Sequence, residues 1–154
     1  MENPFYKVLL VASACAAAFS ASAQEATPCP DYGFPIDAVA EPWADNTRTF
    51  ANGAVRLVVL AYEDPASASF HLALLYPTHD NAPMEGRKCV QINGAWGGFY
   101  ALSFQDLQSS YDPAIGLILR IPAEIYDDSI EGPMGVRLEI IYNQLTEDVQ
   151  ARYR

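Results

Sequence analysis

The sequence predicts an all-β domain, either an antiparallel β-sandwich or a small, partly open barrel of about seven or eight short strands. From Thr47 onward, apolar residues recur with a period close to two, as they do in strands that have one buried face. Turn signals rich in Gly, Asn and Pro divide this part of the chain at spacings of roughly 8–12 residues. Little or no helix is expected outside the N-terminal targeting segment, since no amphipathic helical pattern of useful length follows it.

The clearest strand pattern lies near the end of the chain. Apolar residues at every second position predict one buried face, formed by Met134, Val136, Leu138, Ile140 and Tyr142. We expect the opposite face, with Arg137 and Glu139, to be in contact with water. A second alternating run from Val149 to Tyr153 predicts that the two strands form a hairpin.

Two further hairpins are predicted from turn residues. Asn52-Gly53 lies between Thr47–Ala51 and Val55–Tyr62, and both turn residues tolerate a positive φ. Val55–Tyr62 is apolar on both faces apart from Arg56, which indicates a central strand. Other strands are predicted at residues 70–76, 89–93 and 99–104.

The segment Asp112-Pro113-Ala114-Ile115-Gly116 predicts the third hairpin turn, between strands at 107–111 and 117–121. An alternative reading of the residues just before it is a short helix. Ser103 followed by Asp106 has the spacing of a helix-capping pair.

Residues 1–23 are predicted to be a cleavable signal peptide. Lys7 precedes an uncharged apolar run, Val8–Phe19, and the small residues Ala21-Ser22-Ala23 follow as a cleavage site. The run is too short to span a bilayer, which takes about 20 apolar residues. A lipid anchor at Cys15 is the alternative, but it would leave a very short apolar core. The pattern predicts a periplasmic or secreted protein.

Residues 24–46 are predicted to form an extended lead-in, because four prolines disfavour a long helix there. Trp43 in this segment is expected to pack onto the domain. Residues 47–154 are predicted to form a single β domain. Two cysteines remain after cleavage, Cys29 and Cys89, and an even count in an oxidising compartment predicts one disulfide.

The formal net charge of −10 disfavours nucleic acids and anionic membrane surfaces as partners. No membrane span is expected after signal cleavage, and no cofactor motif is present in the sequence. The only histidines are His71 and His79, and His79 precedes Asp80 in a polar loop. Neither histidine belongs to a recognisable catalytic motif, so no catalytic residue is predicted.

The sequence offers one weak metal candidate and one candidate binding patch. Asp127, Asp128 and Glu131 form an acidic turn that has oxygen ligands suited to calcium but lacks a known calcium-loop spacing. The other candidate is aromatic and follows a glycine-rich turn: Trp96, Phe99 and Tyr100. The alternative without a binding function is that this segment begins a strand with a bulge, which turns Trp96 inward.

These observations predict an exported, acidic, non-enzymatic β domain with a binding or accessory role, whose partner is an unidentified protein or small molecule. A small-ligand carrier with an apolar barrel interior is the first alternative. A small hydrolase that uses carboxylates or His79 is the second.

Overall fold

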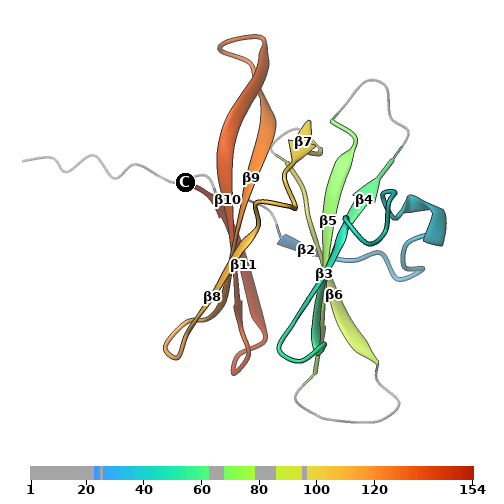
Figure 1. Ribbon diagram of the computed structural model, residues 1–154, viewed down its shortest axis with the longest axis vertical. Helices are drawn as coiled ribbons and strands as arrows, with labels where there is room; N and C mark the ends of the chain where they lie inside the picture. The colour runs from blue at the N-terminus through green and yellow to red at the C-terminus, as the bar shows by residue number, and fades with distance from the viewer. Residues whose placement is uncertain (1–22, 25, 63–67, 79–85, 95–96) are drawn as a thin grey trace, which may run out of the picture.

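The computed structural model describes residues 23–24, 26–62, 68–78, 86–94 and 97–154 (Figure 1). Two antiparallel sheets lie face to face in this part of the chain, which confirms the predicted all-β, sandwich-like fold. The predicted signal peptide, apart from Ala23, and Cys15 lie outside the described residues.

The two sheets together hold more strands than the seven or eight expected, because short edge strands extend both of them. The six-stranded sheet contains β1 (Ala23–Gln24), β11 (Asp148–Tyr153), β10 (Gly132–Asn143), β9 (Gly116–Asp127) and β7 (Ala101–Leu102), with β8 (Gln108–Asp112) also paired to β9. The five-stranded sheet contains β2 (Ala26–Pro28), β6 (Arg87–Ile92), β5 (Phe70–Pro77), β4 (Val55–Ala61) and β3 (Thr47–Phe50), in that order. Since the sheets are separate, the fold is a sandwich and not a barrel.

The three predicted hairpins are confirmed. β3 pairs with β4 across a turn in which Asn52 and Gly53 have φ of 55° and 85°. β8 pairs with β9 across a turn that ends at Gly116, where a Cβ atom would lie 2.2 Å from the Tyr142 carbonyl oxygen. β10 pairs with β11 from Asn143 and Asp148 onward.

The alternative helix near Ser103 is wrong. Residues 105–106 form a turn, in which the Ser103 hydroxyl donates to the Asp106 carboxylate at 2.5 Å. The described residues hold one short 3-10 helix, Ile36–Ala38.

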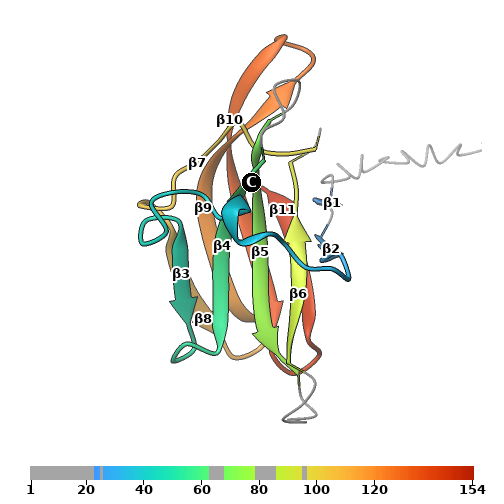
Figure 2. The ribbon, with the colours of Figure 1, turned by 90° about the vertical axis from the view of Figure 1, so that its right-hand side faces the viewer.

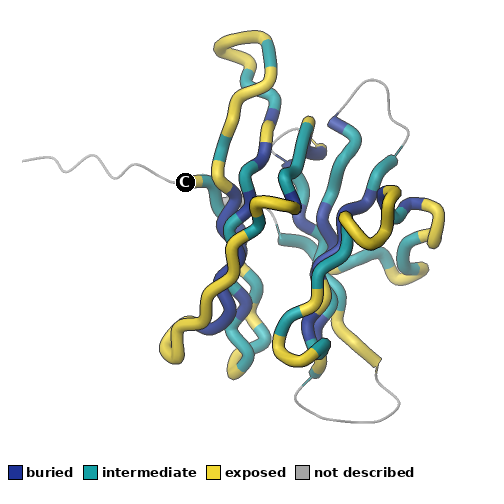
Figure 3. The backbone as a smooth tube through the Cα atoms, viewed as in Figure 1, coloured by how far each residue is buried: buried dark blue, intermediate teal, exposed yellow. Residues whose placement is uncertain are grey.

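The hydrophobic core lies between the two sheets (Figure 3). Alternate residues of every long strand point into it and are almost completely buried: Leu57, Val59, Leu72, Leu74, Leu119, Ile121, Leu138 and Ile140. The predicted buried face of β10 is therefore confirmed for Leu138, Ile140 and Tyr142, but Met134 is 36% exposed. Met134 lies where the β9–β10 hairpin projects beyond the opposite sheet (Figure 1).

A second, smaller apolar layer lies on the outer face of the five-stranded sheet. Val58, Leu60 and Ala73 point away from the core but are still buried, because residues 29–40 cross over them. We call residues 29–40 the strap. In Figure 2, the strap runs from β2 across the face of β6 and β5 towards β4. This cover explains why β4, which also has a strand on each side, is apolar on both faces.

Both ends of the strap are fixed to the sheet. At one end, Cys29 and Cys89 form the predicted disulfide, with their Cα atoms 5.3 Å apart. At the other end, Val39 forms a β-bridge with Leu60, and the Ala40 amide donates to the Val59 carbonyl at 3.0 Å. Trp43, just beyond the strap, is 48% exposed and does not pack as expected.

Replacing both cysteines with serine should lower the free energy of unfolding by about 4 kcal/mol, because the disulfide closes a loop with a sequence separation of 60 residues. Urea denaturation followed by circular dichroism measures the change. Wild-type protein in excess reductant is the matched control and should unfold at the midpoint of the variant. An unchanged midpoint in the variant would contradict the stabilising role of the bridge.

Candidate functional site

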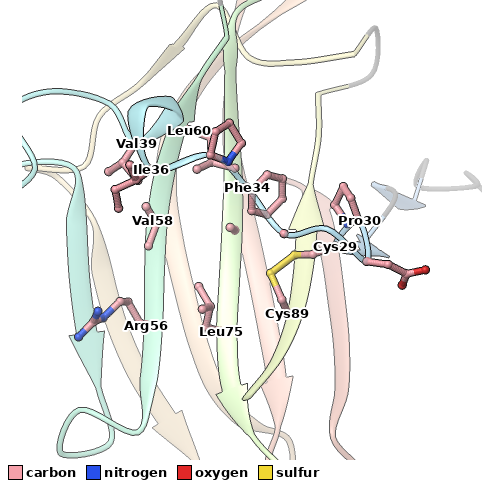
Figure 4. A pocket seen from close by; sticks show the side chains of 14 residues that line it. Cys29, Pro30, Phe34, Ile36, Val39, Arg56, Val58, Leu60, Leu75 and Cys89 are labelled. Atoms are coloured by element: carbon pink, nitrogen blue, oxygen red, sulfur yellow. A yellow bond between two sulfur atoms is a disulfide. The ribbon is translucent and has the colours of Figure 1, made fainter. Parts of the chain in front are cut away.

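An apolar recess on the outer face of the five-stranded sheet lies beside the strap. It has a volume of about 440 Å³, within the range of small-molecule sites. Its floor comes from the sheet and its wall from the strap, as the close-up in Figure 4 shows. The floor residues are Val58, Leu60, Ala73 and Leu75, and the apolar wall residues include Phe34, Ile36 and Val39. We call this recess the apolar hollow.

Arg56 lies at one end of the apolar hollow (Figure 4). Strand pairing places Arg56, Leu75 and Cys89 side by side on β4, β5 and β6. Arg56 is exposed, and it forms no ion pair or hydrogen bond with any residue that the structure describes. Asp31 also lines the hollow, next to Cys29. Cys89 and Arg56 are two strands apart, or about 10 Å. Because Asp31 follows Cys29, which is bonded to Cys89, Asp31 and Arg56 lie towards opposite ends of the hollow.

A second recess, which we call the polar hollow, shares Pro30, Phe34 and Pro35 with the first. Its volume is about 590 Å³, and its other lining residues are Tyr32, Tyr62, His71, Gln91 and Gly97. Tyr62 packs edge-on against His71 with ring centroids 5.0 Å apart. The Phe34-Pro35 segment of the strap thus borders an apolar recess and a more polar one.

Asn93 organises the polar side chains beside the polar hollow. Its Oδ1 atom accepts a hydrogen bond from Gln91 Nε2 at 2.8 Å and lies 2.8 Å from His71 Nδ1. Because Asn93 Oδ1 is an acceptor, His71 Nδ1 must carry the proton in this contact. Burial raises the pKa of Tyr62 above its usual value, and Tyr32 raises it further, so Tyr62 remains a neutral hydroxyl.

The structure describes the contacts of one of the two histidines, His71. His71 contacts Asn93 and Tyr62, and neither of these is a carboxylate or an activated nucleophile. His79 lies outside the described residues.

The predicted aromatic patch is divided between core and surface. Phe99 is fully buried, and its backbone forms a β-bridge with Phe70. It therefore belongs to the core and not to a surface patch. Tyr100 is 45% exposed and stacks on Tyr126 at 6.2 Å. Trp96 lies outside the described residues.

Steric crowding explains why Gly94 and Gly98 of that segment are glycines. A Cβ atom on Gly94 would lie 1.7 Å from the Gly98 carbonyl oxygen, and one on Gly98 would lie 1.9 Å from the Ala68 carbonyl oxygen. The backbone approaches itself too closely there for any side chain.

The calcium candidate is not assembled in the structure. Asp127 accepts hydrogen bonds from the backbone amide and hydroxyl of Ser129, and these bonds hold the pKa of Asp127 below its usual value. Asp128 and Glu131 do not join it, because the described residues contain no group of three His, Cys, Asp or Glu side chains able to hold a metal. The acidic turn instead closes the β9–β10 hairpin.

A charged cluster that sequence reasoning did not find lies on the outer face of the six-stranded sheet. Glu139, expected to be solvated, is only 2% exposed because arginine side chains cover it. Arg120 Nε donates to Glu139 Oε2 at 2.9 Å, and Arg152 Nε and Arg154 Nε donate to Oε1 at 2.8 and 3.1 Å. The sequence shows that charged residues alternate with apolar ones on these strands. It does not show the strand register that brings Arg120 and Arg152 to Glu139.

The surroundings of Glu139 shift its pKa in opposing directions. Burial raises the pKa, but hydrogen bonds and charges from Arg152 and Arg154 lower it by more, and the net pKa lies below the usual value. The ionised form is therefore favoured in the folded protein. Its stabilising contribution is present above about pH 4.5 and is lost as the pH falls through the lower, folded-state pKa.

Comparison with protein-family models, curated proteins and solved structures found no match. No helix in the described part of the chain is long and apolar enough to cross a membrane.

Glu139→Gln should lower the free energy of unfolding at pH 7 by about 1–2 kcal/mol, since it weakens charge-assisted hydrogen bonds to arginines that solvent partly screens. The difference from wild type should shrink as the pH falls below about 4.5 towards the lower pKa that Glu139 has in the folded protein. Urea denaturation at pH 7 and pH 3 measures both effects. Glu124→Gln, an exposed glutamate on the neighbouring β9 strand, is the matched control and should change little. An equal effect of the two variants at pH 7 would refute the role of the cluster.

Proposed function

We propose that this protein is a non-enzymatic binding protein of the periplasm or cell exterior, and that it holds a small apolar molecule with one anionic group. The apolar hollow carries the proposal, because a covalently anchored strap and an apolar sheet face enclose a recess beside an arginine that lacks a partner among the described residues. Few polar groups around an otherwise apolar recess are typical of sites that orient a small ligand.

The position of charge supports the choice of ligand. An anionic group beside Arg56 gains an electrostatic partner, whereas the same group beside Asp31 is repelled. The apolar body would then lie over Val58 and Leu75, against the Ile36 side of the strap. The ligand is thus expected to have one charged end and to lie in one orientation.

The location outside the cytoplasm rests on two observations. The disulfide is typical of oxidising compartments. The pattern of residues 1–23 is typical of a signal peptide. A carrier with a barrel interior, the alternative from the sequence, has less support, since the recess lies outside a sheet and core side chains fill the space between the sheets.

Two fluorescent probes test the proposal: anilinonaphthalene sulfonate, which is apolar and anionic, and its uncharged analogue phenylnaphthylamine. Both should bind the wild-type protein. Arg56→Gln should weaken the sulfonate about threefold to tenfold and leave the uncharged probe unchanged, because only the charge contact is lost. Leu75→Asp should weaken both probes, because it places a carboxylate on the floor of the hollow.

Arg137→Gln is the matched control, because it removes an exposed arginine from the opposite sheet. Circular dichroism of each variant verifies that it is folded. Absence of probe binding to wild-type protein, or equal binding to wild type and Leu75→Asp, would overturn the proposal.

A further inference from the structure

Four arginines and one glutamate lie together on the outer face of the six-stranded sheet. Strand register places Arg120, Glu139 and Arg152 directly opposite one another on β9, β10 and β11. Arg137 and Arg154 lie two residues from Glu139 and Arg152, on the same face. We call these four arginines and Glu139 the arginine face. Within this cluster, four guanidinium groups surround one carboxylate. The same outer face also carries Asp112, Glu124 and Asp148, but these carboxylates form no ion pair with the four arginines in the described part of the chain.

The contacts with Glu139 hold three of these arginines in place but leave some of their N–H donors without an acceptor. The side chains of Arg120, Arg152 and Arg154 are 37%, 38% and 57% exposed, although each contacts the buried carboxylate of Glu139. A guanidinium has five N–H donors. Arg120 Nη2, Arg152 Nη1 and Arg154 Nη1 donate to no acceptor in the described part of the chain. Anchored guanidinium groups with free donors lose little side-chain entropy when they bind an oxyanion.

Arg137 and Arg154 form an unfavourable pair in the absence of an anion. Their backbones exchange two hydrogen bonds, of 3.3 and 2.9 Å, so the residues lie directly opposite each other at a Cα separation of about 5.5 Å. Like charges opposite each other on neighbouring strands are destabilising. Arg137 is exposed and has no ion pair with a described residue. An anion between the two guanidinium groups would remove this repulsion.

We propose that the arginine face binds a small soluble ligand that carries phosphate or sulfate groups, with Arg137, Arg152 and Arg154 as its main contacts. Guanidinium groups match the geometry and charge of tetrahedral oxyanions. The ligand must be small, because the net charge of −10 repels anionic polymers and anionic membranes at longer range. Within a Debye length of about 10 Å, a small ligand experiences mainly the local positive charge. This site is separate from the apolar hollow and does not depend on the function proposed for it.

Titration with inorganic pyrophosphate, at low and constant ionic strength and followed by amide chemical shifts, tests the proposal. Amides of β10 and β11 should shift and saturate in the wild-type protein. Arg137→Gln should weaken binding about threefold or more, because it removes one nearby charge without disturbing the contacts of Glu139. Arg56→Gln, on the opposite sheet, should bind pyrophosphate as the wild type does. In the fluorescent-probe experiment, Arg56→Gln is the test variant and Arg137→Gln the control, whereas here Arg137→Gln is the test variant and Arg56→Gln the control. Failure of one proposal is therefore distinguishable from failure of the other.

A second arm of the experiment uses vesicles of phosphatidylglycerol in phosphatidylcholine. The protein is expected not to sediment with them. Shifts that do not saturate, equal affinity of wild type and Arg137→Gln, or sedimentation with vesicles in the absence of pyrophosphate binding would each overturn the proposal.

Discussion

The packing of the strap against the outer face of the five-stranded sheet is the contact on which the site depends. Without that cover, Val58, Leu60 and Ala73 would expose a continuous apolar surface to water. Their burial contributes to stability in the same way as the core, at roughly 25 cal/mol per Å² of apolar surface removed from water. The strap also forms one wall of the apolar hollow, so the same contact stabilises the domain and shapes the recess.

Much of the fold could be predicted from the sequence, because it depends on local signals. The period-two pattern gives the strands, and Asn52-Gly53 and Gly116 give two of the hairpin turns. The cysteine count gives the disulfide. The course of the strap could not be predicted, because an irregular, proline-rich segment has no period that reports what it covers. The apolar outer face of β4 is the available signal, but the same pattern also fits a central strand that has no such cover.

The sites depend on contacts between residues far apart in the sequence, and these were not predicted. Arg56 and Cys89 become neighbours of Leu75 only through the register of three strands. Arg120 and Arg152 meet at Glu139 for the same reason. An aromatic residue beside glycines is compatible with an exposed patch in sequence, whereas Phe99 fills the core. A single sequence shows residue types and spacing, but not which strands pair.

The two sheets thus have different outer faces: one apolar and covered by the strap, the other charged and open. Nuclear Overhauser contacts between the Phe34 ring and the methyl groups of Val58 and Leu60 would show whether the first face is covered. In the oxidised protein these contacts should be present, and on reduction of the disulfide they should weaken while contacts within the core between the sheets persist. Their absence from the oxidised protein would show that the strap does not cover the sheet, and the apolar hollow would then not exist.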